Sequence, residues 1–226
     1  MLSRIAAALV PAFGRLTVTA DPGARPSTGS ILVANHTSLA DPAVVVAALR
    51  RHGIEPVILA TAGLWRVPLL GPALRREGHI AVHRGTARAA DSLDAAAVAL
   101  ASGRSVLLYG EGGLPLRRDA GESAPGPFRS GLARLAAATG APVVPVGQAG
   151  SRRLCSGSGA KQLAGVFTAP LRRPCLHVHI GSPLHLPDRV PEATDRAREA
   201  VTAAWRTAAS AVGEGACAAA ARRHGR

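Results

Sequence analysis

The hydrophobic positions of this chain form short continuous runs, separated by longer segments in which apolar residues recur every three or four positions. The runs are rich in Val, Ile and Leu, which is typical of buried strands. Strands are predicted at residues 16–20, 31–34, 57–60, 80–82, 106–109, 143–146 and 175–180. Helices are predicted at residues 42–51, 87–101, 130–138 and 192–212. Short strands that alternate with helices predict an α/β fold with a largely parallel central sheet flanked by helices.

The length of the chain fits one domain. It has 226 residues, of which 47% are hydrophobic, enough for a core of its own. We expect a single domain over residues 1–226, with a leader at 1–28, a core at 29–190, and a C-terminal helix with a basic tail at 191–226. The leader carries a short apolar run that suits a helix lying on a bilayer. No segment has about 20 unbroken apolar residues, so no membrane span is expected.

The charge of the chain favours an anionic partner. The formal net charge is +13, and Lys161 is the only lysine among 27 basic residues. Aromatic residues make up only 3% of the chain and offer few platforms for stacking nucleic-acid bases, so no nucleic acid is expected. A phospholipid surface or a phosphate-bearing substrate fits at least as well. We therefore expect peripheral contact with an anionic membrane at the cytoplasmic face of the cell membrane.

Residues 35–42 (NHTSLADP) place a histidine five positions before an aspartate, directly after a predicted strand. A histidine oriented by a carboxylate can take a proton from a hydroxyl near neutral pH. On one helix the two side chains would lie about 140° apart, so the pair works only if His36 lies in a turn and the helix begins after it. Ser38 or Asp41 would cap that helix, with Pro42 in its first turn. The alternative is that Asp41 is only a helix cap and His36 only a turn residue.

Three polar residues each follow a predicted strand closely. His36 follows the strand at 31–34, Arg84 the strand at 80–82, and Glu111 the strand at 106–109. Ligands of α/β proteins gather where parallel strands end, so these residues are expected to share one site. No serine, cysteine or lysine stands in an obvious nucleophile context near His36, which implies direct attack by a substrate hydroxyl.

The order of the motifs resembles that of the glycerolipid acyltransferases, the family of bacterial 1-acylglycerol-3-phosphate acyltransferase. Residues 35–42 are similar to the family's His-x4-Asp block. Four further segments follow in the family's order between residues 16 and 186: residues 65–84 (with WRVPLLG and GHIAVHR), 109–112 (YGEG), 126–131 (GPFRSG) and 141–146 (APVVPV). One such motif is a weak signal, whereas the ordered set is a strong one. The resemblance implies the fold of that family.

The resemblance also implies a reaction, the transfer of an acyl group from acyl-CoA or acyl carrier protein to the free hydroxyl of a lysophospholipid. The acceptor it favours is 1-acylglycerol-3-phosphate, which gives phosphatidic acid. His36 would be the general base, oriented by Asp41, and Arg84 would bind the phosphate of the acceptor. Glu111 and Gly112 match the acceptor-binding block, with Glu111 on the glycerol hydroxyl or holding an arginine. Neither a cofactor nor a metal is expected.

The third block departs from the family pattern. Residues 113–115 (GLP) stand where the family has Thr-Arg-Ser, so the usual second phosphate-binding arginine is missing. Either Arg117 or Arg118 reaches the same place from a longer loop, or the acceptor has another head group. Gly110 replaces the usual proline and is expected to loosen the start of this loop. The alternatives are an acyltransferase for a different lysolipid or glycolipid, or a catalytically silent basic membrane-surface protein on the same fold.

Two other motifs are weighed and set aside. Cys175, His177 and His179 would share one face of a strand, with His185 nearby, but ordinary strand packing is the favoured interpretation over a zinc site. Residues 156–161 (SGSGAK) partly match a phosphate-binding loop, but no glycine precedes Lys161 and no Ser or Thr follows it. This segment is expected to be a mobile loop.

Overall fold

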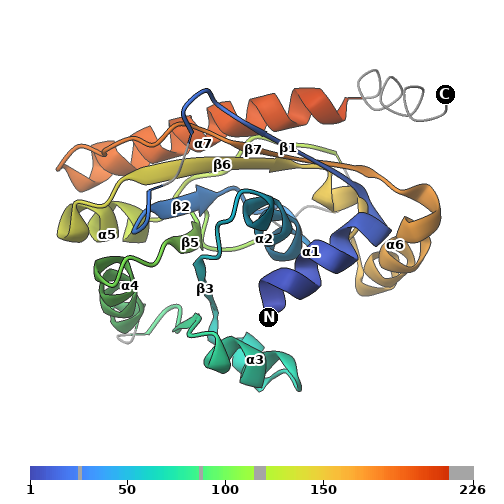
Figure 1. Ribbon diagram of the computed structural model, residues 1–226, viewed down its shortest axis with the longest axis horizontal. Coiled ribbons are helices and arrows are strands. Elements are labelled where there is room, and N and C mark those ends of the chain that lie inside the picture. Colours follow the sequence, from blue (N-terminus) through green and yellow to red (C-terminus); the bar gives the residue numbers. More distant parts are fainter. Residues whose placement is uncertain (25–26, 87–88, 115–120, 214–226) are drawn as a thin grey trace.

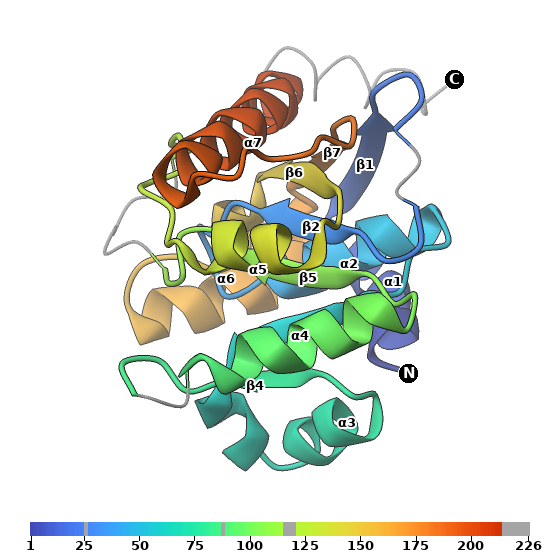
Figure 2. The same ribbon diagram turned by 90° about the vertical axis from the view of Figure 1, so that its left-hand side faces the viewer.

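Seven strands form one sheet with helices on both faces (Figures 1 and 2). The computed structural model describes residues 1–24, 27–86, 89–114 and 121–213. The strands are β1 (Arg15–Ala20), β2 (Ile31–Ala34), β3 (Val57–Thr61), β4 (Ile80–Val82), β5 (Val106–Tyr109), β6 (Val143–Ala149) and β7 (Cys175–Ile180). The helices are α1 (Leu2–Phe13), α2 (Asp41–Arg51), α3 (Leu70–Arg76), α4 (Asp91–Ala101), α5 (Gly131–Thr139), α6 (Gly159–Arg172) and α7 (Val190–Val212), with 3₁₀ helices η1 (Ala62–Arg66) and η3 (Ser151–Arg153).

The strand order is β1-β7-β6-β2-β5-β3-β4. The five strands from β6 to β4 are parallel to one another. Strand β7 pairs antiparallel with β6, and β1 runs parallel to β7, so one edge of the sheet is reversed. The expected α/β domain with a largely parallel central sheet is therefore confirmed.

Strand β2 lies between β5 and β6 and is buried on both faces. Leu32 and Ala34 belong to the hydrophobic cluster that contains residues of α1, α2 and α6. Ile31 and Val33 belong to the cluster that contains residues of α4, α5 and α7. Because side chains alternate along a strand, a continuous apolar run serves both layers. The turn that follows β2 is thereby held at the centre of the sheet edge.

Several elements differ from the expectation. The sequence pattern did not predict η1 or α3, and α4 begins at Asp91 and not at residue 87. The expected mobile loop at 156–161 is wrong for its last three residues, because α6 begins at Gly159 with Ser158 as its N-cap residue. Glycine and serine mark helix starts as well as loops, and the pattern alone did not separate the two. Within the described ranges, no helix combines the length and the apolar character needed to cross a bilayer.

Candidate active site

Three parallel strands end at the same edge of the sheet and place the predicted site residues there. Strands β2, β5 and β4 end at Ala34, Tyr109 and Val82. His36, Glu111 and Arg84 each stand two residues beyond one of these ends. The common strand direction therefore brings the turns that carry these residues to one side of the molecule.

His36 and Asp41 form a hydrogen-bonded pair. The imidazole Nδ1 lies 3.0 Å from Asp41 Oδ2 and donates to it, because a carboxylate only accepts. The same oxygen accepts the backbone N–H groups of Thr37 at 2.5 Å and Ser38 at 2.8 Å. Asp41 is fully buried, whereas the His36 side chain is 13% exposed. Because the proton is on Nδ1, Nε2 is the nitrogen of His36 that can accept a hydrogen bond. The side chain that carries it is partly exposed to solvent.

The expected cap of the following helix is wrong in detail. The N-cap residue of α2 is Ala40, and neither Ser38 nor Asp41 caps the helix through its side chain. Asp41 is the first residue of α2, and its carboxylate reaches back over the turn to Thr37 and Ser38. The carboxylate therefore fixes the conformation of the histidine turn as well as the imidazole. This argues against the interpretation of Asp41 as a helix cap alone.

Tyr109 supports the other side of the imidazole. Its ring is stacked on that of His36, with centroids 4.3 Å apart and planes inclined by 29°. The phenol oxygen is buried and has no hydrogen-bond partner within the described residues. Burial, with the charge of Asp41 nearby, raises the pKa of Tyr109 well above its usual value. The phenol is therefore neutral, and Tyr109 acts on His36 through its ring. The sequence pattern assigned Tyr109 only to a motif and gave it no role.

Glu111 lies beside the histidine turn in a largely dry environment. Burial raises the pKa of Glu111 to about 7, although the backbone N–H of His36, the charge of His36 and the backbone N–H of Gly126 act to lower it. One carboxyl oxygen, Oε1, is buried without a partner among the described residues. Glu111 is therefore a site group whose charge changes near neutral pH.

Glu111→Gln is expected to stabilise the protein more at pH 8 than at pH 5. The unfolded carboxyl loses its proton near pH 4.5 and the folded one only near pH 7, so the stability of the wild type falls as pH rises between these values. Glutamine does not titrate and escapes this loss. Urea midpoints of both proteins at the two pH values test this. The matched control is Glu199→Gln on the surface of α7. A variant effect that is equal at both pH values would contradict the raised pKa.

Two glycines of the third block make room for neighbouring side chains. A Cβ at Gly110 would lie 2.3 Å from the ring of Phe128, so the ring closes over the backbone there. Gly110 also donates to the carbonyl of Ala34 and accepts from the backbone N–H of Arg129. The expectation that Gly110 loosens the loop is therefore wrong. Gly112 has a φ of +68°, and its missing side chain leaves room for Arg129, whose Cγ lies 2.9 Å from the position a Cβ would take.

Arg84 is exposed and reaches toward the third block. Its Nη1 lies 3.6 Å from the position that a Cβ on Gly113 would take. Arg129 lies against Gly112 in the same block, and the sequence pattern gave it no role. The two other arginines predicted for the acceptor phosphate, Arg117 and Arg118, lie outside the described residues.

A buried polar network holds the histidine turn from the side of β6. Asn35 exchanges two hydrogen bonds with the backbone of Gln148, at 3.0 and 2.8 Å. The Gln148 side chain donates to Thr37 Oγ1 at 3.1 Å and accepts from Ser151 at 2.8 Å. Arg152, 2% exposed, donates to the carbonyl of Thr37 at 2.9 Å. The network joins residues more than 100 positions apart, so local sequence patterns carried no signal for it.

The histidine pair considered for zinc is engaged in hydrogen bonds at the reversed edge of the sheet. Thr19 Oγ1 lies 2.9 Å from His177 Nε2 and 2.9 Å from His179 Nδ1. His179 Nε2 lies 3.1 Å from Asp21 Oδ1. Within the described part of the chain, no three His, Cys, Asp or Glu residues are grouped so that they could hold a metal ion. These observations favour the strand-packing interpretation.

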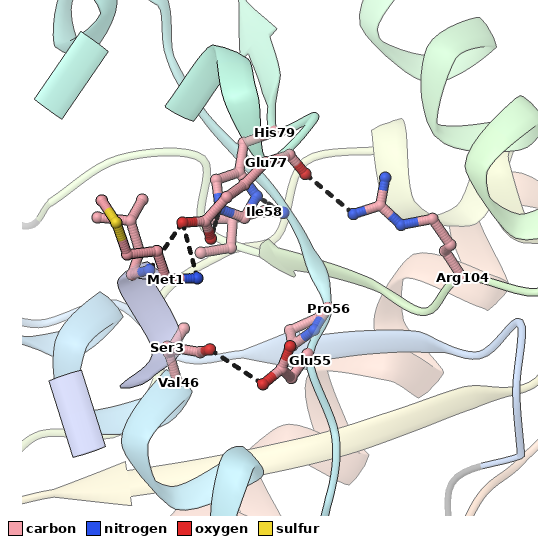
Figure 3. A pocket seen from close by; sticks show the side chains of 10 residues that line it. Met1, Ser3, Val46, Glu55, Pro56, Ile58, Glu77, His79 and Arg104 are labelled. Atoms are coloured by element: carbon pink, nitrogen blue, oxygen red, sulfur yellow. Dashed lines mark hydrogen bonds and ion pairs between the residues drawn. The ribbon is translucent and has the colours of Figure 1, made fainter. Parts of the chain in front are cut away.

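A cavity of about 160 Å³ lies at the opposite edge of the sheet (Figure 3). Several of its lining residues lie just before strands. Pro56 directly precedes β3, His79 directly precedes β4, and Arg104 lies two residues before β5. Figure 3 shows Glu77 and His79 across from the first residues of the chain. None of the predicted site residues lines this cavity, so the histidine turn and the cavity belong to different ends of the strands.

Comparison with known proteins supplies a family and a fold. The family described as Acyltransferase matches residues 15–148. Among the solved structures, the chain is similar to the 1-acyl-sn-glycerophosphate (LPA) acyltransferase PlsC from Thermotoga maritima, with a TM-score of 0.69 and 17% identity. The match covers 94% of this chain and 79% of that one, and at this identity it shows the fold. No curated protein matches the chain.

Proposed function

The chain belongs to the acyltransferase family, and from this premise we propose that it moves a fatty acyl group from a thioester donor to the free hydroxyl of a lysophospholipid. The observation that carries the proposal is the His36–Asp41 pair, 3.0 Å apart, with Nε2 left as the acceptor nitrogen. A base of this kind activates a hydroxyl, as an acyl transfer without an enzyme nucleophile requires. The donor is acyl-CoA or acyl carrier protein.

The proposed mechanism begins with proton transfer from the acceptor hydroxyl to His36 Nε2. The hydroxyl oxygen attacks the thioester carbonyl carbon as the proton leaves, and the buried Asp41 carboxylate stabilises the imidazolium that forms. The tetrahedral intermediate then collapses with cleavage of the carbon–sulfur bond. The departing thiolate takes the proton from His36, which restores the neutral base. The ester and the free thiol are the products.

The acceptor that we propose is 1-acylglycerol-3-phosphate, which would give phosphatidic acid. Arg84 would hold the phosphate, since its exposed guanidinium lies beside the third block. Arg129, packed against Gly112, would supply a second cation. Glu111 would accept from a glycerol hydroxyl or hold an arginine, as its position beside the histidine turn allows. The altered third block, residues 113–115, is the observation that favours a second candidate, a lysolipid with another head group.

Arg84→Ala is expected to raise KM for the lysophospholipid about 10- to 100-fold while kcat changes little. A charged hydrogen bond to phosphate contributes about 1.5–3 kcal/mol, and this interaction is equal in the ground and transition states. The measurement is steady-state kinetics at fixed acyl donor, with Arg134→Ala on the exposed side of α5 as control. An unchanged KM would contradict the phosphate assignment.

The experiment that tests the proposed function is thiol release from a long-chain acyl-CoA with lysophosphatidic acid added. We expect release that depends on the acceptor, with phosphatidic acid as the lipid product. Turnover with another lysolipid alone would show that the third block selects a different head group. An absence of turnover with every lysolipid, from acyl-CoA and from acyl carrier protein, would contradict the proposal and favour a silent binding protein on this fold.

A further inference from the structure

Helix α6 turns its apolar side away from the protein. The fully buried residue of the helix is Ala169, with Gln162 and Gly165 partly buried on the same side. The large apolar side chains are exposed: Leu163 by 63%, Phe167 by 78% and Leu171 by 89%. A helix on a globular protein normally shows the reverse arrangement, with its apolar stripe toward the core.

The three most exposed of these side chains form one stripe, and Val166, 38% exposed, lies at its margin. Residues four positions apart on a helix differ by about 40° in direction, so Leu163, Phe167 and Leu171 fall within about 80°. Ala169 lies about 200° from Phe167, on the side that packs against the protein. We call Leu163, Phe167 and Leu171 the α6 stripe. A contiguous apolar stripe of this kind on a water-exposed surface marks an interaction site.

Helix α1 lies beside α6 and also exposes apolar side chains. It contacts α6, and the two lie beside each other in Figure 1. The guanidinium of Arg173, just after α6, donates to the carbonyl of Pro11 at 3.2 Å. Ile5 and Leu9, one helical turn apart on α1, are also exposed. Two neighbouring helices therefore both expose large apolar side chains.

Positive charge borders the α6 stripe. Lys161 stands in the first turn of α6, Arg172 in its last turn and Arg173 next to it, all exposed. Arg153 is joined to the helix through its carbonyl, which accepts from Arg172 at 3.1 Å. Among the described residues, Lys161, Arg172 and Arg173 form no ion pair, whereas the charge of Arg153 interacts with that of Glu122. Apolar side chains bordered by exposed cations complement an anionic phospholipid layer, with acyl chains beneath its head groups. A second copy of this chain, with a net charge of +13, would present like charges.

The packed side of helix α6 is linked to the histidine turn. Ser38 donates to the carbonyl of Cys155 at 2.6 Å, and Cys155 Sγ donates to Gln162 Oε1 of α6 at 3.4 Å. Leu39, in the same turn, is 63% exposed. A bilayer that covers α6 would therefore lie close to the place where the acceptor hydroxyl meets His36.

We propose that α6, with α1 beside it, docks this protein on an anionic phospholipid bilayer, with the α6 stripe inserted among the head groups. Docking would bring the site to a lipid acceptor held in the membrane. This consequence rests on the proposed function, whereas the docking itself does not. Binding is therefore measured without turnover.

The test is co-sedimentation of the full chain with vesicles of phosphatidylcholine that contain or lack 30% phosphatidylglycerol. We expect binding to the anionic vesicles that weakens at high salt, and about tenfold or greater loss of binding in the double variant Phe167→Ser, Leu171→Ser. Both side chains are exposed, so the thermal midpoint of this variant should equal that of the wild type. The matched control is Val98→Ser, which removes an apolar side chain 70% exposed on α4 and should bind as the wild type does.

Three results would overturn the inference. Equal binding by the wild type and the double variant would remove α6 from the membrane contact, and no binding by the wild type would exclude docking. A wild-type dimer in solution that the double variant converts to a monomer, without vesicle binding, would assign the stripe to self-association. Turnover of the double variant with a short-chain, water-soluble lysolipid separates the two proposals. We expect it to be retained, and its absence from the wild type as well would count against the proposed function only.

Discussion

His36→Ala is expected to lower kcat for acyl transfer by about 10³-fold, within the range of 10² to 10⁴ that a general base contributes. The imidazole is held between the Asp41 carboxylate and the ring of Tyr109, with Nε2 left to accept the proton of the acceptor. Alanine removes the base and leaves the buried network around the turn in place. KM for the acceptor should change little, because His36 acts mainly in the transition state. Thiol release measured under saturating donor checks the expectation.

Two comparisons make this experiment specific. His52→Ala removes an exposed imidazole at the end of α2 and should leave kcat unchanged. The thermal midpoint of His36→Ala should fall only modestly, since the variant loses one hydrogen bond and the stack on Tyr109 while Asp41 keeps its two backbone donors. A folded His36→Ala protein with turnover within a few-fold of the wild type would exclude His36 as the base.

The central architecture could be predicted from the sequence because it is written in local patterns. Continuous apolar runs of the kind seen at Ile31–Ala34 are typical of strands covered on both faces, and their alternation with helices predicts a parallel sheet between helical layers. Because His36 comes directly after such a run, it lies where the carboxyl ends of the parallel strands meet. Strand direction is not encoded in the same way. The reversal of β7 follows from how the chain returns after α6, which no period of the sequence shows.

The remaining residues of the candidate site could not be predicted from local sequence patterns. Gln148 and Arg152 meet Thr37 across more than 100 positions, and only the folded sheet brings β6 beside β2. Tyr109 is adjacent to a motif, but its stack on His36 depends on the register between β2 and β5, in which Ala34 pairs with Tyr109. Helix α6 was missed for another reason. Leu163, Phe167 and Leu171 do recur at helical spacing, but glycine and serine at the start of the segment and Pro170 near its end are typical of a loop.

Gly147→Ala is expected to cost about 3 kcal/mol of folding free energy, with a fall in Tm of about 10 °C. Gly147 lies in β6 under helix α7, where the backbones of strand and helix are in close contact. A Cβ at this position would lie 2.1 Å from the backbone carbon of Ala204 and 2.2 Å from the backbone nitrogen of Trp205. No side-chain rotation relieves a clash with backbone atoms, so α7 must move off the sheet. Ala197 and Val201 are buried residues of α7, and they would then lose contacts with the core.

Thermal and urea unfolding measure this effect, with Gly131→Ala as the matched control. Gly131 is the first residue of α5, and a Cβ there meets only a Leu93 methyl at 3.8 Å, an ordinary contact. Alanine at that position should be neutral or slightly stabilising, since it lowers the entropy of the unfolded chain. Equal stability of the two variants would contradict the close contact between β6 and α7. Because β6 also carries Gln148 to the histidine turn, a large loss for Gly147→Ala should be accompanied by weaker acyl transfer well below the unfolding temperature.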